Sequence, residues 1–240
     1  MNLSNVITRI KLKLGLINIA TPFENIDDTI LTILNTITTP VFSVYYPCKD
    51  TMHVNMHDLE LLEKEATYEK YLLPEFTTRK LLYVFDVKYS NDNLSGLGYY
   101  GGGVPLLEGN LFNQVALANA GASMMSHMIP KMTFKFEPPR VLYVYNAYSS
   151  CQIDIDLGFE HDKSLASIPE TCREEYMKLA LLDVKENLYP TMKQYSEINT
   201  AIGTINLKID DWADAESRRQ DLIDKWDDTY HLDFQPIYYA

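Results

Sequence analysis

The chain has 240 residues, of which 46% are hydrophobic, so it can bury the core of one large domain or two small ones. Its formal net charge of −12 argues against a groove that binds nucleic acid, because phosphate binding needs clustered lysines and arginines. No run approaches the roughly 20 apolar residues of a membrane-spanning helix. The charged residues Arg9, Lys11 and Lys13 interrupt any apolar segment of a signal peptide. We therefore expect synthesis in a cytoplasm and no membrane partner.

The first 68 residues predict mostly helices. Apolar residues recur every three to four positions over residues 3–14, and Gly15 ends this first helix. A second helix takes its buried face from residues 26–37 and ends at Pro40. The pattern then predicts a strand at 41–46 and a short charged helix at 56–68.

From residue 71 the apolar period changes to two, which is typical of strands. Two strands at 132–136 and 140–145 are expected to form a hairpin around Glu137-Pro138-Pro139. A Gly-rich loop at 95–109 and a Met-rich helix at 111–128 precede them. The remaining predicted strands lie at residues 71–74, 80–87 and 152–159.

The last part of the chain predicts two helices separated by one strand. The first starts at Pro169 and ends or kinks at Pro190, with an apolar face that includes Leu181. A strand at 204–209 follows, and Asp210 or Asp211 caps the second helix. Its predicted buried residues are Trp212, Ala215, Leu222, Ile223 and Trp226, and its charged residues, including Arg218 and Arg219, are assigned to a solvated face.

These elements predict an α+β fold in which a helical base carries an inserted, antiparallel β-rich region. The base combines residues 1–65 and 165–230, because helical periodicity occurs at both ends of the chain. The insertion, residues 66–164, contains the Gly-rich loop and the Met-rich helix. Residues 231–240 form an extended C-terminal arm, because Pro236 prevents a helix from continuing.

Residues 96–101 match the glycine pattern of dinucleotide-binding loops. Pro105 and two further glycines follow, so no helix can start there to present its amides to a pyrophosphate. A mobile loop with aromatic tips is therefore the better interpretation. We expect Leu97, Tyr99 and Tyr100 to contact a neighbouring subunit or a tail protein.

Two acidic or imidazole patterns are candidates for metal binding. His53 and His57 have the i, i+4 spacing of helical zinc ligands, but the sequence shows no third ligand, which favours a solvated pair. Asp154 and Asp156 share one face of a predicted strand, and a half-exposed strand is the simpler interpretation. A metal-dependent enzyme that uses these two aspartates with His161 stays open as the alternative.

The three cysteines, Cys48, Cys151 and Cys172, are widely spaced and predict reduced thiols rather than a disulfide framework. A nucleophilic cysteine would need a histidine partner, and no local signature accompanies one. No cofactor is predicted. The Met-rich helix is by default a core element, and a subunit contact is the sharper alternative, formed by Met124, Met125 and Met128.

The order of segments resembles the neck proteins of T-even-like, contractile-tailed bacteriophages, which are head-completion or head-to-tail adaptor proteins. The opening helix at 4–15 resembles that of the family, as do the strands at 71–74, 82–87 and 142–145. The helix around 177–181 and the final strand and charged helix from Gly203 to Arg219 continue the similarity. The similarity spans nearly the whole chain without one diagnostic motif, and it carries no catalytic residues.

This resemblance implies a ring, usually of twelve copies, that connects the portal of the DNA-filled head to further neck or tail proteins. DNA would pass through the ring without specific binding, and the protein would reside in the virion at the head–tail junction. Another ring-forming virion component, such as a tail terminator or a baseplate protein, stays open. In either case we expect no enzymatic activity.

The arm at 231–240 is rich in large apolar side chains, which soluble proteins seldom leave exposed without a partner. We expect Phe234, Ile237, Tyr238 and Tyr239 to anchor it in a groove on the portal or on the adjacent subunit, by pairing of extended backbone.

Overall fold

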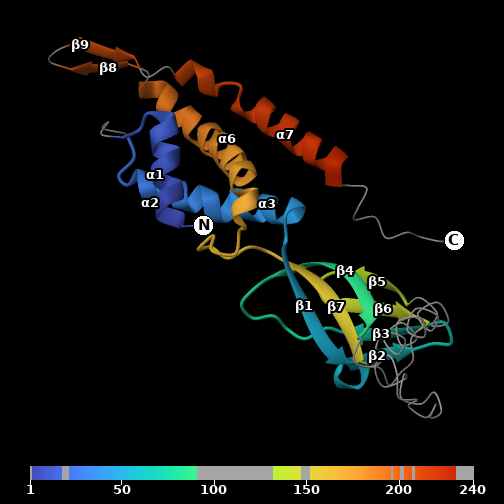
Figure 1. Ribbon diagram of the computed structural model, residues 1–240. Helices are drawn as coiled ribbons and strands as arrows, with labels where there is room; N and C mark the ends of the chain where they lie inside the picture. The colour runs from blue at the N-terminus through green and yellow to red at the C-terminus, as the bar shows by residue number, and fades with distance from the viewer. Residues whose placement is uncertain are drawn as a thin grey trace, which may run out of the picture. The chain divides into compact units, whose positions relative to one another are not determined.

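The computed structural model describes residues 2–17, 22–90, 132–146, 152–195, 197–200, 203–206 and 209–230. It contains helices and antiparallel sheets, which confirms the α+β class. The chain divides into two compact units (Figure 1): residues 1–48 with 159–240 form the helical unit, and residues 49–158 form the β unit. The structure places the boundaries after residues 48 and 158, whereas the sequence analysis placed them after 65 and 164.

Asparagine caps start the first two helices of the helical unit. Before α1 (Leu3–Leu14), the Oδ1 atom of Asn2 accepts the Ser4 N–H, and Gly15 ends the helix in the left-handed conformation with φ 70°. Before α2 (Ile26–Ile33), the Asn25 side chain accepts from the N–H groups of Asp27 and Asp28. The predicted first helix and its glycine end are confirmed.

The predicted strand at 41–46 and the predicted helix end at Pro40 are both wrong. A π-helical turn, Leu34–Thr38, continues α2, and α3 (Thr39–Tyr45) follows it. Pro40 stands in the first turn of α3 and has no N–H, so it donates no hydrogen bond to the turn before it. The change from α to π bonding falls where the proline ring would otherwise clash with the preceding turn, so the chain stays helical through the proline.

The long helix α6 (Arg173–Met192), which follows a 3₁₀ turn at Glu170–Cys172, is the centre of the helical unit. Pro190 lies inside its last turn, so the helix ends two residues later, close to the prediction. Four predicted inward residues, Met177, Ala180, Val184 and Leu188, are buried, as are Ile10, Ile30, Phe42 and Tyr176 from around them. Each such side chain stabilises the fold by roughly 1.5–3 kcal/mol, apart from the smaller alanine.

The helix α7 (Ala215–Tyr230) packs on α6 and follows a 3₁₀ turn at Ile209–Trp212, so the predicted start at Asp210 or Asp211 is several residues early. Trp226 is buried against the rings of Phe42, Tyr45 and Tyr46. The Tyr45 hydroxyl also donates to Asp227 over 2.9 Å. Figure 1 shows α6 between α1 and α7.

A buried ion pair fixes α7 to α6. Asp183 is fully buried, and its two oxygens accept from Thr38 Oγ1 at 2.6 Å and from Arg219 Nε at 2.5 Å. Arg219 also lies 3.6 Å from a carboxylate oxygen of Glu186. The assignment of Arg219 to a solvated face is therefore wrong, because its side chain is only 20% exposed and neutralises a core carboxylate.

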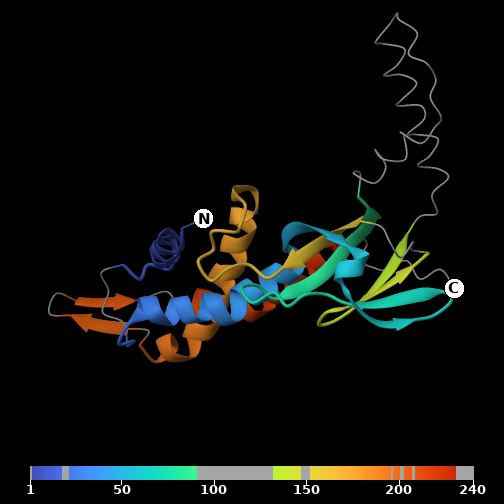
Figure 2. The ribbon, with the colours of Figure 1, turned by 90° about the horizontal axis from the view of Figure 1, so that it is seen from below.

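Between α6 and α7 the chain forms a hairpin rather than one strand. β8 (Glu197–Thr200) pairs antiparallel with β9 (Gly203–Asn206), and the hairpin projects from one end of the helical unit in Figures 1 and 2. The predicted strand at 204–209 overlaps β9 but extends too far, since Ile209 begins a 3₁₀ turn.

The β unit contains a three-stranded and a four-stranded sheet. The first has the order β1 (Cys48–Asn55), β7 (Gln152–Phe159) and β4 (Leu81–Tyr89). The second has the order β2 (Glu60–Lys64), β3 (Tyr68–Leu72), β6 (Val141–Tyr145) and β5 (Thr133–Glu137), and it is antiparallel throughout. The predicted hairpin around Glu137-Pro138-Pro139 is confirmed, because β5 pairs with β6.

The predicted helix at 56–68 is wrong: only the 3₁₀ turn Met56–Asp58 is helical, and β2 follows it. β2 is an edge strand whose residues are all exposed, so its sequence carries no alternating pattern to reveal it. β3 carries a buried carboxylate, Glu69, which forms an ion pair with Lys64 of β2 and accepts a hydrogen bond from the Tyr71 hydroxyl.

None of the described helices is long and apolar enough to cross a membrane.

Candidate assembly surfaces

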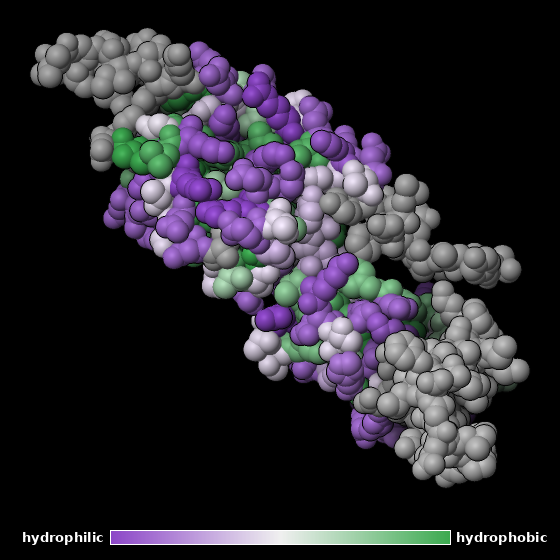
Figure 3. Space-filling view, in the orientation of Figure 1, coloured by the Kyte–Doolittle hydropathy of each residue, from purple (hydrophilic) through white to green (hydrophobic). Residues whose placement is uncertain are grey.

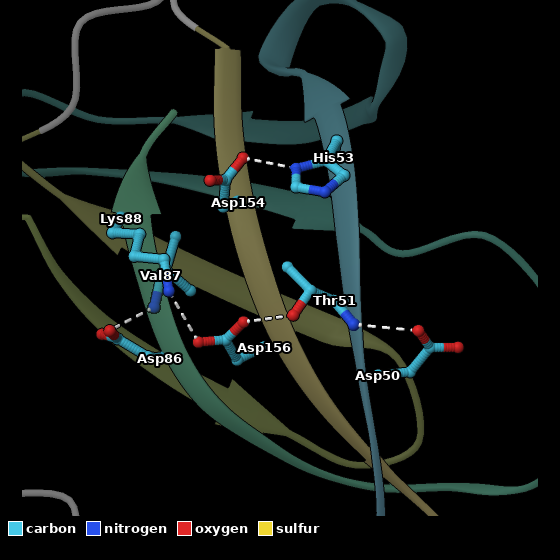
Figure 4. A network of polar contacts seen from close by, with 8 residues as sticks. All are labelled: Asp50, Thr51, His53, Asp86, Val87, Lys88, Asp154 and Asp156. Carbon is cyan, nitrogen blue, oxygen red and sulfur yellow. Dashed lines mark hydrogen bonds and ion pairs between the residues drawn. The ribbon is translucent and has the colours of Figure 1, made fainter. Parts of the chain in front are cut away.

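Polar side chains join the three strands of the smaller sheet on one face (Figure 4). His53 Nδ1 of β1 lies 2.8 Å from Asp154 Oδ1 of β7. The hydroxyl of Thr51 on β1 donates to Asp156 Oδ1 over 2.7 Å, and Lys88 Nζ on β4 donates to Asp156 Oδ2 over 2.9 Å. The opposite face of β7 presents Ile153, Ile155 and Leu157 to the core, as the sequence pattern predicts.

These contacts favour the charged form of Asp156. The hydrogen bond from Lys88 is the main cause of a lowered pKa at Asp156, and the Thr51 hydroxyl adds to it. The same bond raises the pKa of Lys88. The carboxylate oxygens already have protein donors, so this face is a set of cross-strand pairs that stabilise the sheet. His53 and His57 are both exposed, which agrees with the predicted solvated pair, although His53 also contacts Asp154.

His161 is buried in the helical unit, whereas the two aspartates belong to the β unit. Its Nε2 lies 2.7 Å from the Tyr46 carbonyl oxygen, and this nitrogen carries the hydrogen because a carbonyl only accepts. Its Nδ1 lies 2.9 Å from Ser167 Oγ. These bonds join α3 to the loop before α6, which is a structural role.

The metal-dependent alternative therefore has no assembled site in the part of the chain that the structure describes. Within the described ranges no three His, Cys, Asp or Glu side chains are grouped to hold a metal ion. Cys48 and Cys172 are half-buried and form no disulfide within the described residues, and Cys151 lies outside them.

A surface groove of about 420 Å³ lies between α1 and α6. We call it the lysine groove; its lining consists of Lys13, Lys178, Leu181, Leu182 and Lys185. The four α6 residues have i, i+3, i+4, i+7 spacing, so they form one stripe of that helix. Figure 3 shows hydrophobic residues among hydrophilic ones at the surface of the helical unit.

The groove concentrates positive charge on a chain of net charge −12. Lys178 forms an ion pair with Glu175 at 2.6 Å. No described carboxylate lies within ion-pair distance of Lys13 or Lys185. Apolar lining combined with unneutralised cations is typical of a surface that receives an acidic partner.

A comparison with protein-family models matches residues 1–235 to the family described as bacteriophage ring protein. The chain belongs to the bacteriophage ring protein family. A search of curated proteins gives no match. The family match covers both units, and it makes the protein a ring-type structural component of a phage particle, assembled from several subunits. It does not single out the neck proteins of T-even-like phages, so that finer position belongs to the proposal below.

The contact residues that the sequence suggested for this ring protein lie outside the described residues. These are the loop tips Leu97, Tyr99 and Tyr100, the methionines Met124, Met125 and Met128, and the arm residues Phe234, Ile237, Tyr238 and Tyr239.

Sequence reasoning missed the lysine groove of the ring protein. It assigned Leu181 to the buried face of its helix, whereas Leu181 is half-buried and lines the groove. A signal was present, because Lys178 and Lys185 stand one above the other on a helix with the two leucines between them. The contribution of Lys13 from α1 had no such signal, since it depends on how α1 packs on α6.

Proposed function

We propose that this ring lies in the neck of the phage particle, where it connects the portal of the DNA-filled head to the tail and surrounds the DNA channel. The observation that supports this position is the net charge of −12 on each subunit. A ring of twelve copies multiplies that charge, and a lumen that shares it repels phosphates, so that DNA slides through without binding. The order of segments, which resembles that of neck proteins, supports the same position.

The test asks whether the protein is bound to heads or to tails when the other part of the particle is missing. In lysates of a tail-deficient phage, the protein should remain on DNA-filled heads, and in lysates of a head-deficient phage it should be absent from the tails. Gold-labelled antibody against the protein should then mark the head–tail junction of whole particles in electron micrographs. Protein that is found on tails without heads, or at the distal tail end, would instead identify a tail terminator or a baseplate ring.

A further inference from the structure

The outer face of α7 carries an acidic stripe that consists of Asp221, Asp224 and Asp228. The three residues are exposed and recur at i, i+3, i+7, which places them on one side of the helix. The buried residues of α7, Ala215 and Trp226, lie on the opposite side. The stripe therefore faces away from α6.

The charges of this acidic stripe are mostly available to a partner. Asp224 accepts a hydrogen bond from Gln220 over 2.7 Å, which leaves its charge in place. Within the described residues, no cation lies within ion-pair distance of Asp221 or Asp228. Lys13 and Lys185 of the lysine groove are the positive counterpart, because no described carboxylate lies within ion-pair distance of either.

The two surfaces also match in spacing. Lys178 and Lys185 are seven residues apart on α6, and Asp221 and Asp228 are seven residues apart on α7. Seven residues of α-helix span roughly 10 Å at about 1.5 Å per residue. Two helices that meet side by side can therefore bring both charge pairs together at once.

One subunit cannot join its own two surfaces. The lysine groove lies where α6 meets α1, and the acidic stripe points away from α6 on the far side of α7. A contact between two different surfaces of identical subunits is heterologous, and such contacts generate rings when the rotation closes. The family requires a ring, and the helical unit offers two complementary surfaces for it.

We propose that the lysine groove of one copy binds the acidic stripe of the next copy in the ring. This inference rests on the ring assembly that the proposed function uses, and it does not depend on where the ring lies in the particle. Complementary charges fix the register of the two helices, and the half-buried Leu181 and Leu182 are covered by the neighbouring helix. Because the charged groups are partly exposed, added salt weakens the contact.

A charge exchange tests the contact in the full-length chain. The groove variant carries Lys178→Glu and Lys185→Glu, and the stripe variant carries Asp221→Lys and Asp228→Lys. Each variant alone brings like charges together and should associate at least about tenfold more weakly than the unmodified protein in sedimentation experiments at low salt. An equimolar mixture should regain association, because the groove of each variant then faces an oppositely charged stripe, and subunits alternate around the ring.

A matched control carries Lys80→Glu and Lys163→Glu, which change the net charge of the chain as the groove variant does, at exposed sites outside the groove. The control should assemble as the unmodified protein does, and circular dichroism should show that all variants are folded. The inference is overturned if the unmodified chain stays monomeric at high concentration and low salt, if either variant alone assembles normally, or if the mixture does not recover. In those cases antibody labelling of the head–tail junction would still support the proposed function. If the mixture recovers but the antibody labels another part of the particle, only the neck position is refuted.

Discussion

At the scale of single residues, the sequence predicted most apolar core positions but missed the buried charges. Met177 and Val184 follow a helical period, and period alone places them inside. Asp183 stands next to Val184 and is fully buried, because Thr38 and Arg219 supply its hydrogen bonds from elsewhere in the chain. No local pattern predicts such partners, since they depend on the packing of three separate segments.

We predict that Arg219→Ala destabilises the helical unit by about 3–5 kcal/mol, because Asp183 would then be a buried carboxylate without a cation. The neighbouring substitution Arg218→Ala is the control. Arg218 is exposed and lies 3.7 Å from Asp214, so its loss should cost only about 0–1 kcal/mol. Urea unfolding followed by tryptophan fluorescence reports on this unit, because both tryptophans, Trp212 and Trp226, belong to it. Equal losses in the two variants would contradict the role of the buried pair.

At the scale of elements, strongly periodic segments were predicted well and transitions between elements were not. Residues 41–45 of α3 are rich in β-branched and aromatic side chains and follow Pro40, which is a strand signal by local propensity. The π-helical turn before Pro40 and the burial of Phe42 against Tyr176 keep this segment helical. Tertiary packing thus overrides the local preference, and a single sequence cannot show that.

The C-terminal arm stays a prediction at this scale, since residues 231–240 lie outside the described residues. We expect that deleting 233–240 leaves the subunit folded, because the core contains no described residue beyond Trp226. Attachment to heads should be lost if Phe234, Ile237, Tyr238 and Tyr239 anchor the arm in the portal. Heads that lack the protein can be incubated with the full-length or the truncated chain, and bound protein measured. Equal binding by both chains would contradict an anchoring role.

At the scale of the whole molecule, the ends of the chain build one unit and its middle builds the other. The sequence pattern suggested this arrangement through helical periods at both ends, but it could not place the boundaries. The sequence pattern predicted that the helical base continues past residue 48. Instead β1 begins at Cys48, because it pairs with β7, which lies about a hundred residues later in the chain. Long-range pairing decides such boundaries.

We predict that residues 49–158 fold when produced alone, because this segment is continuous and contains both larger sheets. Residues 1–48 alone should not fold, because their buried side chains, such as Ile10 and Phe42, pack on α6. Amide exchange distinguishes the two fragments: protection is expected in the first and fast exchange throughout the second. A protected 1–48 fragment would show that the N-terminal helices do not need α6.

Because the helical unit is built from both ends of the chain, it can fold only after nearly the whole chain has been synthesised. Helices α1, α2 and α3 emerge first, with apolar faces that are covered only when α6 and α7 follow. More than a hundred residues separate Tyr45 from Arg173, which corresponds to on the order of ten seconds at about 5–20 residues per second. The β unit can fold during that interval, whereas the apolar surface of the N-terminal helices stays exposed until their packing partners are synthesised. In an infected cell that makes many copies at once, this delay is the period in which nascent subunits are most open to aggregation or to capture by a chaperone.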